Sequence, residues 1–478
     1  MAADTVLRLP GARLGKRSFL LDTVDPDTLN SLERQIRLER TLFICASKSG
    51  KSIETHSLLL YFLQKMKLLA VENPGQHFVA LAEDDSYLAQ LARSYAFIDA
   101  FFDPPGILGR FSGLIHFNFF LATVGHFDPQ DLLGRTRAMR DACGPTAPES
   151  GNPALSLAAL LVAGELQGLH RLLVIGPRSL EPFAFRIARL IGACTGKEGR
   201  GILPIVARLP ADPSVLQRKT LVAVLKSGNE HAAELDHLLD QLRLAGVPHV
   251  DIELNGPQNL AAELFKWEIA AALACVQLRL NPFEDPEVRE TRSNITQILD
   301  RIAAGQQVPS TTVRVKEGDV ELFAERETRQ QISTLSMTEA LRTFFALRSP
   351  DSYLALIAFH GLTPETEEKL QNARKRLESA LGLPVLISSA PRYLLGLAQA
   401  CKDGPPGGLF ILWTAHSASD VSVPGAPYSF GQLQLAMALA EFESLGRNKR
   451  PVIRLHLARG AEQGLIQLES MLANALGK

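Results

Sequence analysis

The chain has 478 residues, 46% of them hydrophobic, and its 50 basic and 51 acidic side chains leave a net charge close to zero. This balance gives no electrostatic basis for binding nucleic acid or an anionic membrane surface. No run of 18 or more apolar residues lacks charges, and the first residues lack the charged-then-apolar order of a signal peptide. We therefore expect neither a membrane span nor a secretion signal.

The cysteines and histidines suggest no metal or disulfide framework. Five cysteines are scattered at positions 45, 143, 194, 275 and 401, without a Cys-x-x-Cys pair, and the eleven histidines show no metal-ligand spacing. Scattered, unpaired cysteines are typical of reduced thiols in a cytoplasmic protein. We expect a cytoplasmic protein without a metal or another cofactor.

Short apolar strands alternate with amphipathic helices along the whole chain. In the first part we predict strands at 18–21, 41–46, 77–81 and 97–101, a helix at 131–141 and a linker at 144–153. In the second part we predict helices at 154–167, 180–193 and 260–280, and strands at 171–175, 202–206, 220–225 and 249–253.

A third part is predicted to begin near residue 310. Its predicted strands are 312–315, 353–360, 385–388, 408–413 and 452–456, and its most periodic helix is 364–381. This alternation predicts an α/β fold with largely parallel sheets, in which ligands bind at the carboxyl ends of strands. The length favours more than one domain, and we predict three, at 1–147, 148–309 and 310–478.

The segment Ser47-Lys-Ser-Gly-Lys-Ser-Ile-Glu-Thr55 directly follows the predicted strand 41–46 and opens a helix. The first turn of a helix offers unpaired N–H groups and the positive end of the helix dipole. The hydroxyls and cations that accompany these groups are those of Ser47, Lys48, Ser49, Lys51, Ser52 and Thr55. The order predicts a binding site for the phosphate of a small molecule.

This segment has two other interpretations. A nucleotide-binding P-loop would need a glycine five residues before Gly50, and that residue is Cys45, so we reject it. A simple helix cap remains open, because Ser and Thr favour the N-cap position without any ligand. The number of hydroxyls and the two lysines favour the phosphate site.

Several motifs in fixed order resemble glucose-6-phosphate isomerase. Nearly the whole chain is covered, and the resemblance is greatest to the isomerase half of bacterial transaldolase/glucose-6-phosphate isomerase fusions. The motifs are Asp22-Thr-Val-Asp-Pro, the 41–50 segment, Gly109-Arg-Phe-Ser112, Asn152-Pro-Ala-Leu-Ser, Thr195-Gly-Lys-Glu-Gly-Arg-Gly-Ile-Leu-Pro204, Asn281-Pro-Phe-Glu-Asp-Pro-Glu-Val288, Pro391-Arg-Tyr393 and Pro424-Gly-Ala-Pro-Tyr-Ser-Phe-Gly431.

The resemblance implies two sugar-isomerase (SIS-type) doubly wound domains, followed by a C-terminal α/β region. It also implies interconversion of glucose 6-phosphate and fructose 6-phosphate, the isomerase step of glycolysis and gluconeogenesis. A carboxylate base moves a proton between C2 and C1 through an enediolate, and a His and a Lys assist ring opening. By resemblance Ser47, Lys48, Ser49 and Ser52 contact the phosphate, and Arg110 steadies the enediolate.

Three family positions are substituted in this chain. Counting from Thr195-Gly-Lys, the position of the base Glu is Ala193, and alignment on Pro391-Arg-Tyr-Leu places Leu395 where the family has His. The family Lys is replaced by Arg292, which holds its proton too tightly for ordinary acid–base exchange. We expect isomerase activity to be weakened or lost. A working isomerase that uses relocated groups or groups from a partner chain is the alternative.

Glu198 and Lys402 are the weak candidates for relocated groups, although the simpler expectation for both is a solvated loop residue. The family also has a Gly-rich strand and turn before the segment that starts here at Ala2, and the sequence has no residues for it. We therefore expect a separate polypeptide, an upstream segment or a rebuilt first domain, and with it an oligomer or a complex with a chain that completes the first sheet.

Overall fold

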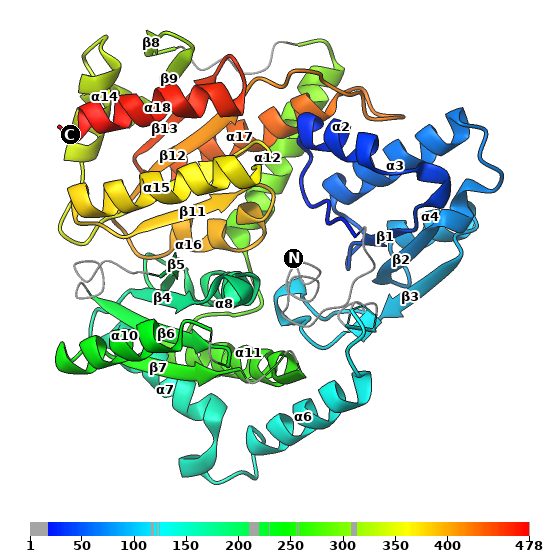
Figure 1. The fold of residues 1–478 in the computed structure, drawn as a ribbon. Coiled ribbons are helices and arrows are strands. Elements are labelled where there is room, and N and C mark those ends of the chain that lie inside the picture. The colour runs from blue at the N-terminus through cyan, green and yellow to red at the C-terminus, as the bar shows by residue number, and fades with distance from the viewer. Residues whose placement is uncertain are drawn as a thin grey trace.

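The computed structural model describes residues 18–115, 119–120, 122–123, 125–209, 219–228, 230–254, 256, 258–306 and 313–477. In these residues the strands form three separate sheets (Figure 1). Strands and helices alternate along the chain, and each of the three sheets contains buried apolar strands, as expected for an α/β fold. The predicted fold class, α/β with mainly parallel strands, is confirmed.

The first sheet has the strand order β1-β2-β3, and all of its pairs are parallel. Asp25 caps the first helix by accepting a hydrogen bond from the N–H of Thr28 at 2.9 Å. The elements are α2 (Pro26–Gln35), β1 (Phe43–Ala46), α3 (Ile53–Leu68), β2 (Phe78–Glu83), α4 (Tyr87–Ser94), β3 (Asp99–Asp103) and α6 (Pro129–Ala142). The strand predicted at 18–21 is wrong. These residues form no strand pair and run as a coil toward α2.

The second sheet has the order β5-β4-β6-β7 and is also parallel throughout. Asn152 caps α7, and the predicted linker 144–153 is the connection between α6 and α7. The elements are α7 (Pro153–Leu166), β4 (Arg171–Gly176), α8 (Glu181–Thr195), β5 (Leu203–Arg208), β6 (Thr220–Lys226), α10 (Ala232–Leu244), β7 (His249–Glu253) and α11 (Gln258–Leu278).

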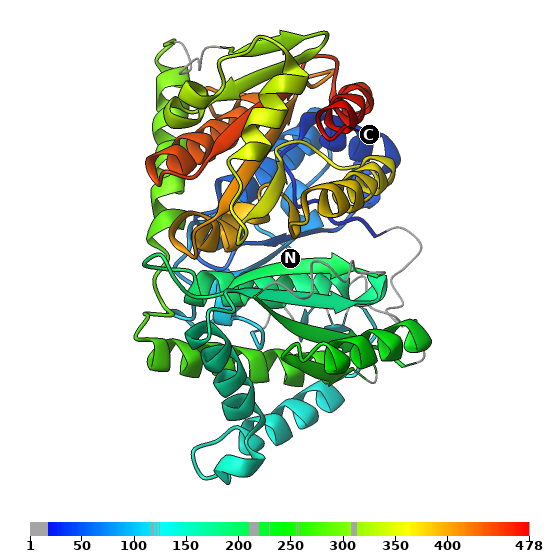
Figure 2. The same cartoon turned by 90° about the vertical axis from the view of Figure 1, so that its left-hand side faces the viewer.

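The third sheet has the order β11-β10-β12-β13-β9-β8 and is mixed, because β9 pairs antiparallel with β13 and with β8. Its strands are β8 (Val315–Glu317), β9 (Val320–Ala324), β10 (Tyr353–Ala358), β11 (Val385–Ser389), β12 (Gly408–Ala415) and β13 (Val452–Leu457). The accompanying helices are α12 (Pro286–Ala303), α13 (Arg326–Gln331), α14 (Met337–Ala346), α15 (Pro364–Leu381), α16 (Leu397–Asp403), α17 (Phe430–Arg447) and α18 (Ala461–Ala475). Figure 2 shows α12 along one side of the molecule.

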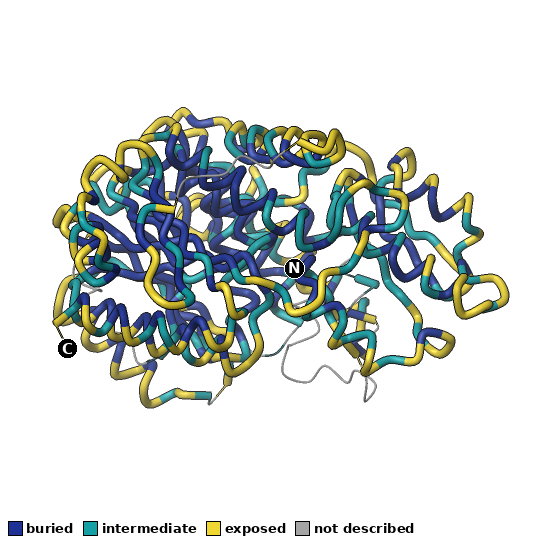
Figure 3. The backbone as a smooth tube through the Cα atoms, turned by 90° about the horizontal axis from the view of Figure 1, so that it is seen from above, coloured by how far each residue is buried: buried dark blue, intermediate teal, exposed yellow. Residues whose placement is uncertain are grey.

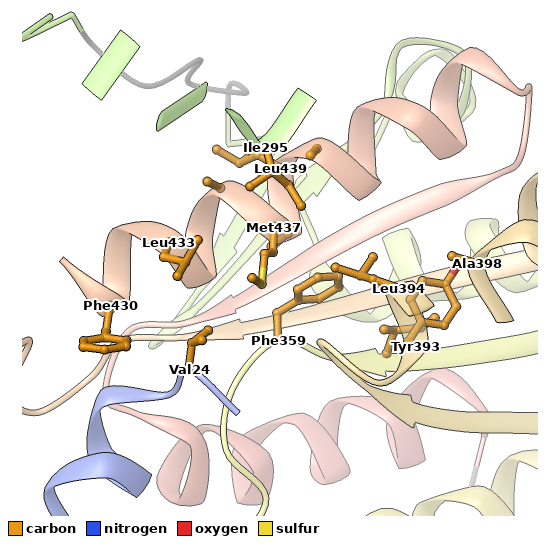
Figure 4. Packing of buried hydrophobic residues seen from close by; sticks show 14 of the residues in the cluster. Val24, Ile295, Phe359, Tyr393, Leu394, Ala398, Phe430, Leu433, Met437 and Leu439 are labelled. Carbon is orange, nitrogen blue, oxygen red and sulfur yellow. The ribbon is translucent and has the colours of Figure 1, made fainter. Parts of the chain in front are cut away.

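Successive side chains of β10 point alternately to the two faces of the third sheet. Leu354 and Leu356 face α14, α15 and α18, whereas Tyr353 and Ile357 belong to a core with α12, α16 and α17. That second core also contains residues from α2, α3 and the first sheet, so it joins the first and third sheets. Figure 4 shows part of it, where Val24 from the chain start lies near Phe430 and Phe359. Figure 3 shows buried backbone running through the interior and exposed backbone mainly at the periphery of the molecule.

The described residues contain no helix long and apolar enough to cross a membrane.

Candidate functional site

The Ser47–Ser52 turn lies between the carboxyl end of β1 and the first turn of α3 (Figure 1). The chain leaves β1 beside β2, since the N–H of Ser47 bonds to the carbonyl of Leu81 at 3.1 Å. Ser52 is the N-cap residue of α3, but its hydroxyl makes no capping hydrogen bond. The turn therefore presents a helix N-terminus at the end of a parallel strand, where α/β proteins bind anions.

The predicted phosphate contacts fall into two groups in the structure. Ser47, Lys48, Ser52 and Thr55 line one cavity of about 1000 Å³, together with Glu54. Ser49 and Lys51 are exposed and are not among its lining residues. The structure thus brings four of the six predicted side chains to the cavity and leaves two on the outer surface of the turn.

Three of the four lining side chains are already engaged. The hydroxyl of Thr55 donates to the carbonyl of Ala46 at 3.4 Å. The Nζ of Lys48 forms an ion pair with Glu83 at 2.5 Å and donates to the carbonyl of Pro104 at 3.3 Å. The hydroxyl of Ser52 donates to the Glu54 carboxylate at 3.2 Å. Lys48 therefore shares its charge with Glu83, and an incoming phosphate would compete with Glu54 for the Ser52 hydroxyl.

The same cavity is also lined by arginines. Arg186 and Arg189 come from α8, and Arg392 comes from the segment before the 3₁₀ turn η6 (Tyr393–Leu395). Leu395 lines the cavity as well, and the Nη2 of Arg189 donates to its carbonyl at 3.4 Å. The cavity lining thus includes residues of the phosphate turn, of α8 and of the segment that contains Leu395.

Arg110 lies in the 3₁₀ turn η3 (Gly109–Phe111) and ties three segments together. Its Nη1 donates to the carbonyls of Pro282 and Glu284 at 3.0 Å each and to the carbonyl of Ala193 at 3.5 Å. Its Nη2 forms an ion pair with Asp285. The arginine matched to the family's enediolate-stabilising residue thus lies directly beside the position of the family's base.

The three substituted positions come together around Arg189. Ala193 is one turn further along α8 and is buried, Leu395 accepts from Arg189, and Arg292 on α12 is close enough to affect its pKa. Burial, followed by the charges of Arg186, Arg392, Arg110 and Arg292, holds the pKa of Arg189 well below its usual value. The three positions therefore lie in one region of the molecule, around Arg189.

The two candidate relocated groups lie in different environments. Glu198 is on an exposed turn at φ +57°, and its carboxylate pairs with Arg200 at 3.2 Å. Lys402 was expected to be a solvated loop residue, and this expectation is wrong. Its side chain is 0% exposed and its Nζ lies 3.0 Å from the Glu441 carboxylate and 2.5 Å from the Thr291 hydroxyl. A buried ammonium needs such partners, because an isolated charge is costly in a protein interior.

Arg186, Arg189 and Arg392 were not predicted from the sequence as site residues. A signal was present, because Arg186 and Arg189 are three residues apart on a helix that is otherwise largely apolar and buried. Arg186 pairs with Glu268 of α11 at 3.5 Å, and Arg392 pairs with Asp22 at 2.5 Å. Charged residues at buried helix positions indicate either an internal ion pair or a ligand site.

Glu268 is a second residue that the sequence analysis missed. Burial raises its pKa to about 7, although Arg186 and the N–H of Gly113, which donates at 2.9 Å, both favour the ionised form. Glu268 is not among the residues that line the cavity. It holds the backbone near Arg110 and does not face the proposed ligand.

No model of a known protein family matches the chain. Curated relatives include a probable glucose-6-phosphate isomerase from Natronomonas pharaonis, 27% identical over 322 residues, which are 60% of this chain and 74% of the relative. Another, from Haloquadratum walsbyi, is 27% identical over 304 residues, covering 56% of this chain and 70% of the relative. A glucose-6-phosphate isomerase from Carboxydothermus hydrogenoformans is 30% identical over 188 residues, 39% of this chain and 40% of the relative.

Solved structures give a matching result for the fold. A glucose-6-phosphate isomerase from Chlamydia trachomatis aligns with a TM-score of 0.54 at 19% identity, covering 63% of this chain and 68% of that chain. A hypothetical protein from Thermus thermophilus aligns with a TM-score of 0.56 at 22% identity, covering 62% of this chain and 80% of that chain. The chain therefore shares its α/β fold with these proteins.

Proposed function

We propose that the chain is a glucose-6-phosphate isomerase family protein that binds a hexose 6-phosphate, with its own isomerase activity weakened or lost. The named relatives and the shared fold support the family and the ligand class. The observation that carries the loss of activity is the position of Ala193, whose carbonyl lies 3.5 Å from Arg110 and whose side chain is a methyl group. The base would be needed at this point, and a methyl group abstracts no proton.

The phosphate would bind at the N-terminus of α3, near Ser47, Ser52 and Thr55. Anchoring there would fix the remote end of the sugar and orient its reactive carbons within the cavity. Leu395, which lines the cavity, offers no imidazole for ring opening. Arg292 is exposed, is not a lining residue and does not exchange a proton easily. Binding would therefore survive, while proton transfer between C2 and C1 would not.

The alternative, a working isomerase with relocated groups, is less well supported. Glu198 is exposed on its turn and engaged with Arg200. Lys402 is enclosed with Glu441 in the interior. A group lent by a partner chain remains compatible with this geometry.

Calorimetric titration with fructose 6-phosphate tests the binding step. We expect Ser47→Ala combined with Ser52→Ala to weaken binding about tenfold or more, because hydrogen bonds to a charged group contribute about 1.5–3 kcal/mol each. Lys51→Ala is the matched control on the exposed side of the same turn and should change the affinity much less. Equal affinities for all three proteins, or no binding at all, would leave the turn as a simple helix cap.

We also propose that the chain works in the cytoplasm, as an oligomer or with a chain that completes the first sheet. All five cysteines are free, and within the described residues β1 is an edge strand with one neighbour, β2. Light scattering combined with amide hydrogen exchange tests the assembly. A monomer at micromolar concentration with strongly protected β1 amides would contradict it.

A further inference from the structure

The outer side of α7 has a composition that the proposed function leaves unexplained. Among the fourteen residues of this helix, all of which the structure describes, the only charged side chain is Glu165, and it is half-buried. A helix that is apolar on every side is normally buried on every side. The inner side of α7 packs on α11 (Figure 1), but its outer side is exposed. The outer side therefore has the composition of a surface that another helix covers.

Four apolar residues lie in a line along this outer side, and we call them the α7 stripe. They are Leu155, Ala159, Val162 and Leu166, at successive spacings of four, three and four residues. Such spacings bring side chains to the same side of a helix. Leu155 is 38% exposed and Leu166 is 75% exposed, whereas Ala159 is exposed and Val162 is half-buried. Single exposed leucines are common on protein surfaces, but a continuous apolar line is typical of an interaction surface.

The spacing of the stripe is the same in both directions along the helix. When a second copy of α7 is turned by 180° about an axis perpendicular to the helix, Leu155 of one copy meets Leu166 of the other. At the centre Ala159 meets Val162, so a small side chain lies against a larger one and the two backbones can approach closely. Alternating spacings of three and four residues are also those with which helices pack side by side. The stripe is therefore complementary to itself in an antiparallel arrangement.

Charge also favours a second copy of the chain as the partner. In a two-fold symmetric contact, side chains near the axis lie close to their own copies, so a charged residue there would repel itself. The other exposed residues of α7 include Ser156 and Ala163, which are small and uncharged. Antiparallel helices also place the positive end of one helix dipole beside the negative end of the other. The outer side of α7 thus meets the electrostatic requirement of a symmetric contact.

We propose that α7 is the contact helix of a two-fold symmetric homodimer, in which the α7 stripes of two copies pack antiparallel. This contact gives the oligomer of the proposed function a specific surface, and it is independent of hexose 6-phosphate binding. The fourteen residues of α7 span about 21 Å, so the helix alone covers less than the roughly 800 Å² per partner of a standard interface. The dimer is therefore weak, and its population rises with protein concentration.

Sedimentation velocity of the full-length protein, from low to high micromolar concentration, tests the contact. We expect the wild type to shift from monomer toward dimer. Leu166→Glu should weaken dimerisation at least about tenfold, because it places two carboxylates in an apolar contact. Leu244→Glu makes the same chemical change at a leucine of α10 that is 89% exposed, and this matched control should dimerise like the wild type. A wild type that stays monomeric, or unchanged association in Leu166→Glu, would overturn the proposal.

Calorimetric titration with fructose 6-phosphate separates this proposal from the proposed function. The cavity-lining residues in the described part of the chain come from elements other than α7. Leu166→Glu should therefore bind fructose 6-phosphate like the wild type, which also shows that the variant is folded. Absence of binding by the wild type would overturn the hexose 6-phosphate function, and the dimer would be decided by sedimentation alone.

Disulfide trapping tests the antiparallel arrangement. Leu155→Cys and Leu166→Cys proteins are oxidised separately and as an equal mixture, with the oxidised wild type as the control for the five native cysteines. In the proposed dimer the two copies of position 155 are about 16 Å apart along the helices, beyond the roughly 4.4–6.8 Å between the Cα atoms of a disulfide. We expect a cross-linked dimer in the mixture only. Cross-links in the separate samples, or none in the mixture, would overturn the antiparallel contact.

Discussion

Gly50 takes a left-handed conformation, φ +62°, in the middle of the phosphate turn. A Cβ at this position would lie 2.5 Å from the Cβ of Ser86 and 2.9 Å from the backbone nitrogen of Tyr87. Both the conformation and the close approach to the start of α4 require glycine. Backbone geometry therefore requires glycine at position 50 of the turn.

We predict that Gly50→Ala destabilises the protein by about 1–3 kcal/mol, because alanine at a positive φ is strained and its methyl group meets the α4 backbone. Urea denaturation measures the change. Gly106→Ala, at φ +80° with open space around its Cβ position, is the matched control that carries the conformational strain alone. Equal losses in the two variants would show that the contact with Ser86 has no effect.

The raised pKa of Glu268 predicts a pH-dependent contribution to stability. The folded protein holds this proton with a pKa of about 7, above the ordinary value of 4.5 for the unfolded chain, so the folded state binds it more tightly. The contribution is therefore greatest below pH 4.5 and is lost as the pH rises toward 7 and above.

Glu268→Gln should remove this dependence. We expect the stability of the wild type relative to the variant to fall by on the order of 3 kcal/mol between pH 4.5 and pH 8. Chemical denaturation across that range measures the difference. A constant difference would mean that Glu268 is ionised throughout, held by Arg186 and by the N–H of Gly113.

At the scale of elements, Lys402 and Glu441 join α16 to α17 through a fully buried ion pair at 3.0 Å. Thr291 of α12 and Tyr393 of η6 complete the network, because the Tyr393 hydroxyl donates to Glu441 at 2.8 Å and the Lys402 Nζ donates to Thr291. The network thus connects four elements of the core that links the first and third sheets. Residues at the end of α8 are not part of it.

We predict that Lys402→Met alone costs about 3–5 kcal/mol, because it leaves the Glu441 carboxylate buried without a counter-charge. Adding Glu441→Gln should recover part of this loss, since a neutral amide needs no cation. Lys316→Met, which breaks an exposed pair with Glu321, is the control and should have little effect. A mild single variant, or a double variant no better than the single, would contradict the prediction.

The regular elements were largely predictable from the sequence. The predicted helix 364–381 coincides with α15, because Thr363 caps it and Gly382 ends it in a left-handed conformation. The strand β9 was missed, because five residues that follow a two-residue turn give too short a pattern to recognise. A strand was predicted at 18–21, because these mainly apolar residues fit the apolar pattern of a short strand. In the structure they are part of the coil at 18–25 and pair with no other strand.

At the scale of the whole molecule, the turn at 47–52 was predictable, whereas the cavity-lining arginines Arg186, Arg189 and Arg392 were not. The turn is a contiguous segment with its own local signals, whereas the tertiary fold brings the arginines of α8 to a segment some 200 residues later. The domain boundaries at 147 and 309 stay predictions. In the structure α6 packs on α11, and the first and third sheets share one core.

The most direct test is a coupled assay of the purified, contaminant-free protein with fructose 6-phosphate, run in parallel with calorimetric binding. It shows whether the chain binds the sugar phosphate but has lost isomerase activity. General base catalysis is typically worth about 10²–10⁴-fold, so we predict a kcat at least about a hundredfold below that of an intact family member, with binding retained. Ala193→Glu combined with Leu395→His and Arg292→Lys should raise kcat. A normal rate from the unmodified chain would contradict the proposed loss of activity, and Glu198→Gln would then test whether the base has moved.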